Sequence, residues 1–156
     1  MDAKDPCPCQ SNVAFGDCCQ PILDGGAAAQ TPQQLMRSRY TGYYLGKLSY
    51  LLESWHPQTR PASLDHGSSG IWVGLEVIDS KTEASGDEGM VEFRAKMIHN
   101  NLLELLHEKS LFNKIEGRWY YHSGELRNRS EPPKAISKNS LCPCGSQLKF
   151  KRCHYV

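Results

Sequence analysis

The stretch LCPCGSQLKFKRCH, residues 141–154, and the stretch CPCQSNVAFGDCC, residues 7–19, decide how the two ends of the chain fold. In each, a Cys-x-Cys pair is followed after eight residues by two adjacent residues of ligand type. These are Cys153-His154 in one stretch and Cys18-Cys19 in the other, and all seven cysteines of the chain lie in the two stretches. The repeated spacing predicts two small knuckles of similar shape on either side of a cysteine-free middle.

Each knuckle offers four donors that a turn can bring around one ion, in the tetrahedron that Zn²⁺ accepts. The candidate metal ligands are Cys142, Cys144, Cys153 and His154 at the C-terminal end, and Cys7, Cys9, Cys18 and Cys19 at the N-terminal end. All four positions are filled by protein, which favours a structural metal. Ferrous iron suits the same ligands, so the sequence leaves Fe²⁺ open, although Zn²⁺ binds more tightly.

Seven cysteines in 156 residues is also a rich count for a disulfide framework. Disulfide domains spread their cysteines along the chain and carry a secretory signal, whereas this chain starts MDAKDPC without an apolar segment. His154 stands where a fourth cysteine would be, and imidazole replaces thiolate at a metal but not in a disulfide. The pattern therefore favours metal and a reducing cytoplasm.

The C-terminal stretch resembles the SEC-C motif, the metal-binding tail of the bacterial translocation motor SecA, in its Cys-x-Cys-x8-Cys-His form. Between the two copies stand TPQQLMRSRYTGYYLGKLSYLLESWHP from Thr31 and HEKSLFNKIEGRWYY from His107. This arrangement is similar to the bacterial YchJ-like family. The resemblance implies a central domain of the cystatin-like or nuclear-transport-factor-2-like type, a curved sheet wrapped on helices, and it supplies no established biochemical activity.

Length, composition and charge limit the classes of protein to which this chain can belong. A chain of 156 residues and 17.5 kDa suits one principal domain of about 100 residues with short appendages. Hydrophobic content of 39% and charged content of 22% are ordinary for a soluble globular protein. A net charge of +1 argues against nucleic-acid binding over the whole protein surface. No apolar run approaches the roughly 20 residues that span a bilayer.

The middle of the chain changes from helical to strand-like periodicity. Thr31-Pro32 is a strong helix start, Gly46 can end that helix, and a second helical pattern runs from Leu48 to Trp55. Strand patterns follow at 71–78, 91–97, 102–112 and 118–121. The order predicts an α+β fold in which two N-terminal helices pack on a curved antiparallel sheet, flanked by the two zinc knuckles.

Four units are therefore expected. They are an N-terminal SEC-C-like knuckle at 1–22, the central α+β domain at 30–126, a linker at 127–138 and a C-terminal knuckle at 139–156. The linker RNRSEPPKAISK has low hydrophobicity and a Pro-Pro pair, which predicts a solvated tether and a mobile tail knuckle. The first knuckle has apolar Val13 and Phe15 and no cation in its inner stretch, so we expect it to pack on the central domain.

The tail knuckle carries Lys149, Lys151 and Arg152, which we take as partner-binding residues. By resemblance to the SecA tail, the partner is expected to be a protein, either an acidic chaperone such as SecB or the ribosome; direct RNA binding would be weak. The favoured function is thus a cytoplasmic zinc-binding adaptor rather than an enzyme, and an enzymatic activity is left open as the alternative. The sequence does not determine the oligomeric state.

The alternative is a small-molecule or enzymatic pocket in the middle domain. Its acid–base groups are His56, Asp65, His66, His99, His107 and Glu108. Adjacent strand residues point to opposite faces, so His107 and Glu108 do not form a dyad. We therefore assign no catalytic residue. Tyr40, Tyr43 and Tyr44 could line such a pocket, but we interpret them as a stripe of the core.

Overall fold

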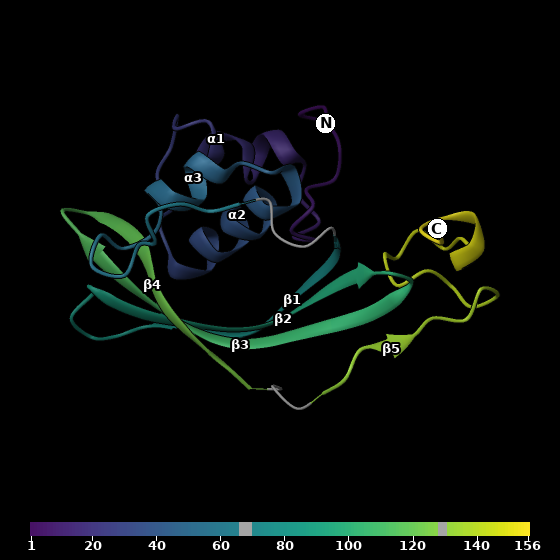
Figure 1. Cartoon of the computed structure of the whole chain (residues 1–156). Coiled ribbons are helices and arrows are strands. Elements are labelled where there is room, and N and C mark those ends of the chain that lie inside the picture. The colour runs from purple at the N-terminus through teal and green to yellow at the C-terminus, as the bar shows by residue number, and fades with distance from the viewer. Residues whose placement is uncertain (66–69, 128–130) are drawn as a thin grey trace.

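The computed structural model describes residues 1–65, 70–127 and 131–156. Its helical elements are η1 (Phe15–Asp17), α1 (Gln20–Leu23), α2 (Pro32–Leu45), α3 (Leu48–Glu53) and η2 (Phe150–Arg152). Its strands are β1 (Ile71–Thr82), β2 (Glu88–His99), β3 (Leu102–Ile115), β4 (Arg118–Leu126) and β5 (Lys134–Ala135). The predicted helix pair followed by four strands is present, and the α+β fold is confirmed (Figure 1).

Helix α2 begins and ends as its sequence predicts. The Thr31 side chain accepts a hydrogen bond from the backbone N–H of Gln34, and Pro32 occupies the first turn. At the other end Gly46 adopts the left-handed conformation, with φ 69° and ψ 30°. The chain then turns directly into α3.

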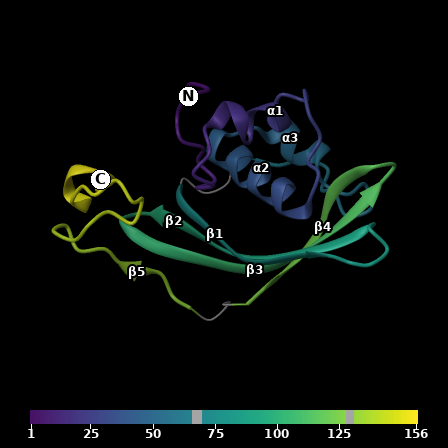
Figure 2. The same cartoon turned by 180° about the vertical axis from the view of Figure 1, so that it is seen from behind.

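The sheet is an antiparallel meander in the order β1-β2-β3-β4. Register shifts interrupt the ladder between Trp72 and Gly74, between Val77 and Asp79, and between Leu111 and Phe112. Such irregularities bend and twist long strands. The strands accordingly curl into a half-barrel, and the helices lie on its concave side (Figure 2).

The main core lies between α2 and the concave face of the sheet. It contains Leu35, Met36 and Tyr40 from the helix and Val91, Phe93 and Phe112 from the strands. Cys7, Cys9, Cys19 and Phe15 belong to the same cluster. The expectation that the first knuckle packs on the central domain is therefore confirmed, although Val13 stays exposed.

The tail knuckle is docked on the sheet, which corrects the expectation of a mobile one. Phe150 has no exposed surface and packs with Cys142 against Val73 and Ile98, and burying a phenylalanine side chain stabilises by about 1.5–3 kcal/mol. The tether is partly structured, because β5 pairs with Leu102 and Leu103 at the start of β3. In the part of the chain that the structure describes, no helix is long and apolar enough to cross a membrane.

Candidate metal centres and an aromatic pocket

The two knuckles have the same backbone structure. The N–H of Cys7 donates to the carbonyl of Val13 at 3.0 Å, and the N–H of Cys142 donates to that of Leu148 at 2.8 Å. Each Cys-x-Cys pair ends in a tight turn, and each return begins with a short 3-10 helix, η1 or η2. The similarity predicted from the spacing thus extends to the fold of the two ends.

The structure brings all eight predicted ligands together in two groups of four. Within each group the donor atoms lie within 4.8 Å of one another. The sulfur pairs Cys9–Cys18 and Cys144–Cys153 are 3.6 Å and 3.5 Å apart. Tetrahedral zinc with Zn–S bonds of about 2.3 Å places sulfurs about 3.8 Å apart, whereas a disulfide needs about 2.05 Å. The spacing suits an ion held between free thiols.

His154 completes the second group through one ring nitrogen. Its Nδ1 lies 3.2 Å from the sulfur of Cys142 and 3.2 Å from that of Cys153. A nitrogen at this corner of the group can take the fourth position at a tetrahedral ion. The donors therefore fit a soft or borderline divalent metal, a class that includes zinc and ferrous iron.

Hydroxyl groups lie beside the sulfurs in equivalent places. Ser11 Oγ is 3.1 Å from Cys18 Sγ, and Ser146 Oγ is 3.3 Å from Cys153 Sγ. Helix α2 adds Thr41, whose Oγ1 lies 3.9 Å from Cys7 Sγ. Such neighbours orient ligands and disperse the sulfur charge.

Helix α2 also supplies the N-terminal knuckle with a cation. Arg37 Nη1 donates to the carbonyl oxygen of Cys9 at 2.8 Å. The sequence within the knuckle lacks a cation, and spacing alone did not identify Arg37. Arg37 is half-buried on α2, and the helical pattern around it did not single it out.

Burial disfavours bare thiolates in both clusters. It raises the pKa of Cys18 to about 11 and that of Cys142 to about 12. Hydrogen bonds from Cys19 and Cys7 instead lower the pKa of Cys9. A divalent cation would supply the charge that lets all the thiols of a cluster ionise together, so metal binding and folding of each end are linked.

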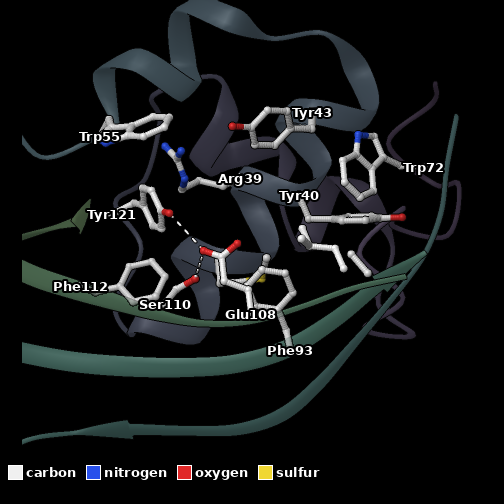
Figure 3. Close-up of a pocket in the computed structure, with 13 residues that line it drawn as sticks. Arg39, Tyr40, Tyr43, Trp55, Trp72, Phe93, Glu108, Ser110, Phe112 and Tyr121 are labelled. Atoms are coloured by element: carbon white, nitrogen blue, oxygen red, sulfur yellow. Dashed lines mark hydrogen bonds between the residues drawn. The ribbon is translucent and has the colours of Figure 1, made fainter. Parts of the chain in front are cut away.

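A pocket of about 270 Å³ lies between α2, Trp55 just beyond the end of α3, and the concave face of the sheet (Figure 3). Aromatic rings form most of its wall. They belong to Tyr40, Tyr43, Trp55, Trp72, Phe93, Phe112 and Tyr121. Tyr43 lines the pocket and is 41% exposed, and Tyr44 is exposed as well, so the interpretation of the three tyrosines as a core stripe is wrong except for Tyr40.

Glu108 brings a carboxylate into this aromatic pocket. Its Oε1 accepts hydrogen bonds from Ser110 Oγ at 2.9 Å and from Tyr121 Oη at 3.1 Å. Burial, and then the nearby Glu108 charge, raise the pKa of Tyr121, so its hydroxyl stays protonated as a donor. The two hydroxyls fix the orientation of the carboxylate.

Arg39 is the cation that lines the pocket, and its guanidinium hydrogen-bonds to α3 and to the residue that follows it. Its Nη1 donates to Leu51 O at 2.7 Å and to Ser54 Oγ at 2.6 Å. Its guanidinium lies over the rings of Trp55 and Tyr121, at 5.0 Å and 4.6 Å from their centroids. Burial lowers its pKa. Arg39 thus joins α2 to α3 as well as lining the pocket.

Of the acid–base groups expected in the middle domain, Glu108 lines the pocket. His107 lies on the opposite face of the sheet, 3.0 Å from Glu92, as strand alternation predicts. His99 lies 3.6 Å from Glu104, the rings of His56 and His122 are 5.1 Å apart, and Asp65 lies in a loop. His66 lies outside the described residues. The structure therefore brings together no histidine–carboxylate pair inside the pocket among the residues that it describes.

Family models match nearly the whole of this architecture. The model of the YchJ middle NTF2-like domain matches residues 31–124, and the SEC-C motif matches residues 4–21 and 139–155. The chain belongs to the YchJ-like family. The half-barrel with helices on its concave side is accordingly of the nuclear-transport-factor-2-like type.

Proteins of several bacteria are similar to this chain over most of its length. A UPF0225 protein of Photorhabdus laumondii is 41% identical, with 94% of this chain and 96% of the relative covered. A solved SEC-C motif containing protein from Psychrobacter arcticus is 30% identical, with a TM-score of 0.67 over 97% of this chain and 96% of the other. Another, from Rhodopseudomonas palustris, is 34% identical with a TM-score of 0.71, and covers 78% of this chain and 98% of its own.

Proposed function

We propose that this protein is a cytoplasmic zinc-binding interaction protein whose C-terminal knuckle contacts a protein or ribosomal partner. The observation that carries the proposal is the surface of the docked knuckle. Lys149, Lys151 and Arg152 are all exposed there, beside the exposed apolar side chains of Leu148 and Tyr155. Cations around an apolar patch suit an acidic protein surface or a phosphate-rich one.

Metal gives this surface its shape. So short a peptide has little core of its own, and the ion would hold the exposed cations in fixed positions relative to one another. Lys138 lies 4.6 Å from the centroid of the Tyr155 ring and extends the basic surface toward the tether. Because the knuckle is docked, the partner would meet one rigid face that includes the adjacent end of the sheet.

The test reverses the charge of the three residues in one variant, Lys149→Glu, Lys151→Glu and Arg152→Glu. A matched control reverses Lys4, Lys47 and Lys81, which are exposed elsewhere. Binding to purified ribosomes and to an acidic chaperone such as SecB is measured for both. The proposal expects the first variant to lose binding and the control to keep it. Equal binding by both variants and the original chain would overturn it.

Salt dependence separates a ribosomal RNA contact from a protein contact. Binding to RNA phosphates falls steeply and linearly on a log–log plot as counterions are released, with a slope set by the number of phosphates contacted. A protein contact built on Leu148 and Tyr155 depends less on salt. Direct binding to isolated RNA is expected to be weak because the chain carries a net charge of only +1.

The pocket supports a second function, binding of a small molecule within the middle domain. Its volume of about 270 Å³ is near the lower end of the range for ligand sites, and it combines apolar walls with a few oriented polar groups. In this function the two knuckles stabilise the domain around the pocket. Binding of a small aromatic compound that perturbs Trp55 and Trp72 but leaves Trp119 unchanged would support it, since only the first two line the pocket.

A further inference from the structure

We infer that the pocket binds an organic ammonium ion, a protonated amine attached to a compact apolar body. This inference rests on the second function proposed above and adds the chemical class of the ligand. Three features of the pocket carry it. They are an oriented carboxylate with a free oxygen, aromatic rings on the other side of the pocket, and an arginine that hydrogen-bonds to Leu51 and Ser54 and not to that carboxylate.

The carboxylate of Glu108 presents one oxygen to the pocket. Both hydrogen bonds from Ser110 and Tyr121 go to Oε1. Within the described residues no donor is recorded at Oε2, which points toward the open centre of the pocket (Figure 3). A half-buried carboxylate oxygen of this kind is a strong acceptor for a charged N–H group, because charge-assisted hydrogen bonds are about twice as strong as neutral ones.

Strand β4 is shaped to leave room for this carboxylate. A Cβ at Gly124 would overlap the side-chain carboxylate of Glu108 and approach the Tyr121 hydroxyl to 2.9 Å. Gly124 pairs with Ser110 across the β3–β4 ladder, so it lies directly beside the group that orients Glu108. Its backbone does not require glycine, since its φ is not in the left-handed region. Glycine at position 124 therefore leaves the space that the Glu108 carboxylate occupies.

The rings of Tyr40 and Trp72 form the side of the pocket away from Arg39, and Tyr43 lies between Arg39 and Trp72 (Figure 3). The centroid of Trp72 lies 6.0 Å from that of Tyr40 and 6.2 Å from that of Tyr43. The faces of aromatic rings attract a cation through their quadrupoles, and cages of such rings recognise alkylammonium groups. An amine here would have a carboxylate on one side and rings on the other.

Arg39 interacts with the charge of Glu108 at longer range but does not contact its carboxylate. No ion pair within 4.0 Å joins them among the described residues, and the guanidinium instead lies against Trp55 and Tyr121. A ligand nitrogen at about 2.9 Å from the free oxygen of Glu108 would be attracted more strongly than the more distant Arg39 repels it. An anionic ligand in the same place would be repelled by the free oxygen of Glu108. The pocket therefore favours a cation.

The experiment compares three probes of similar size and shape on the full chain at neutral pH. They are 2-phenylethylammonium, neutral 2-phenylethanol and anionic 3-phenylpropanoate. Binding is followed by two-dimensional NMR of the three tryptophan indole N–H groups. Trp55 and Trp72 line the pocket, whereas Trp119 Nε1 donates to Gln30 O elsewhere and serves as an internal control.

We expect the ammonium to shift the Trp55 and Trp72 signals and to bind at least about 10-fold more tightly than the alcohol. Glu108→Gln should remove that preference while its amide still accepts from Tyr121 and Ser110. Glu92→Gln deletes a carboxylate from the outer face of the same sheet and should leave the preference unchanged. Preferential binding of the carboxylate, or equal binding of all three probes, overturns the ammonium inference but keeps a ligand pocket. If none of the probes moves the two signals, both the inference and the pocket function fail.

Discussion

Gln10 in the N-terminal knuckle and Gly145 in the C-terminal knuckle occupy the same place in the same turn, and both have positive φ, 58° and 82°. Glycine adopts this conformation freely, whereas glutamine does so at a cost. Two hydrogen bonds between the Gln10 side chain and the backbone of β1 offset that cost. Its Nε2 donates to Val73 O at 3.4 Å, and its Oε1 accepts from the N–H of Leu75 at 3.3 Å.

Gln10→Ala is therefore expected to lower the free energy of unfolding by about 1–3 kcal/mol, because two backbone groups of β1 lose their partners. Gln147→Ala is the matched control. It makes the same change at another exposed position with positive φ, 66°, in the other knuckle. Denaturant unfolding of both variants is the measurement. An equal loss of unfolding free energy in the two variants would show that the side-chain hydrogen bonds of Gln10 do not stabilise the fold.

Metal content should be two ions per chain in protein purified without chelator, one for each cluster. Cys144→Ser and Cys9→Ser should each remove one ion, as measured by elemental analysis. Cys9→Ser should lower the melting temperature more than Cys144→Ser does, by on the order of 10 °C. The reason is that three of the four cysteines of the N-terminal cluster lie in the main core. Ser146→Ala keeps all four ligands and serves as the control. Full metal content in Cys144→Ser would contradict the assignment.

Gly124→Ala should displace the carboxylate of Glu108 and lower the free energy of unfolding by about 1–3 kcal/mol through overpacking. It should also weaken binding of 2-phenylethylammonium. Gly26→Ala is the control, because its new methyl group would meet only Pro21 O at 3.7 Å. Thermal unfolding and the indole NMR titration check the two effects. Unchanged stability and binding in Gly124→Ala would show that Glu108 does not need this space.

The pair Glu92–His107 predicts a pH dependence of stability. The hydrogen bond from His107 lowers the pKa of Glu92 in the folded protein. A carboxyl with a depressed folded pKa stabilises the fold fully above its unfolded pKa of about 4.3, and this contribution is lost as the pH falls through the folded value. Glu92→Gln should therefore be less stable than the original chain at pH 7, with the difference shrinking in acid. Metal loss in acid affects both proteins equally, and a difference that grows in acid would contradict the prediction.

The sequence predicted those elements whose signals are local. Thr31 and Gly46 mark the ends of α2, and strict alternation from Val91 to Met97 identifies β2. The cysteine spacing predicted the ligand groups for the same reason, since each group lies within 13 residues. Adjacent strand residues point to opposite faces, and this rule correctly separated His107 from Glu108.

The pocket and the docked tail depend on contacts between distant segments. Arg39, Trp55, Glu108 and Tyr121 meet only after the sheet has curled, and no period links them. One signal was available: Arg39 lies between Met36 and Tyr40 on the apolar side of α2, an unusual place for a charge. The tail sequence 127–138 is polar, which hides the docking role of Phe150 further along.

Both ends of the chain rest on the same few residues of β1. Gln10 bonds to Val73 and Leu75, while Phe150 packs on Val73, and this segment follows directly after Trp72 in the wall of the pocket. The irregular part of β1 is thus contacted by both knuckles, each of which has four residues that could hold an ion. If oxidation or metal depletion detached either knuckle from Val73, the neighbouring residue Trp72 in the pocket wall would be free to shift. Ligand binding in the pocket would then depend on the metal available to the protein.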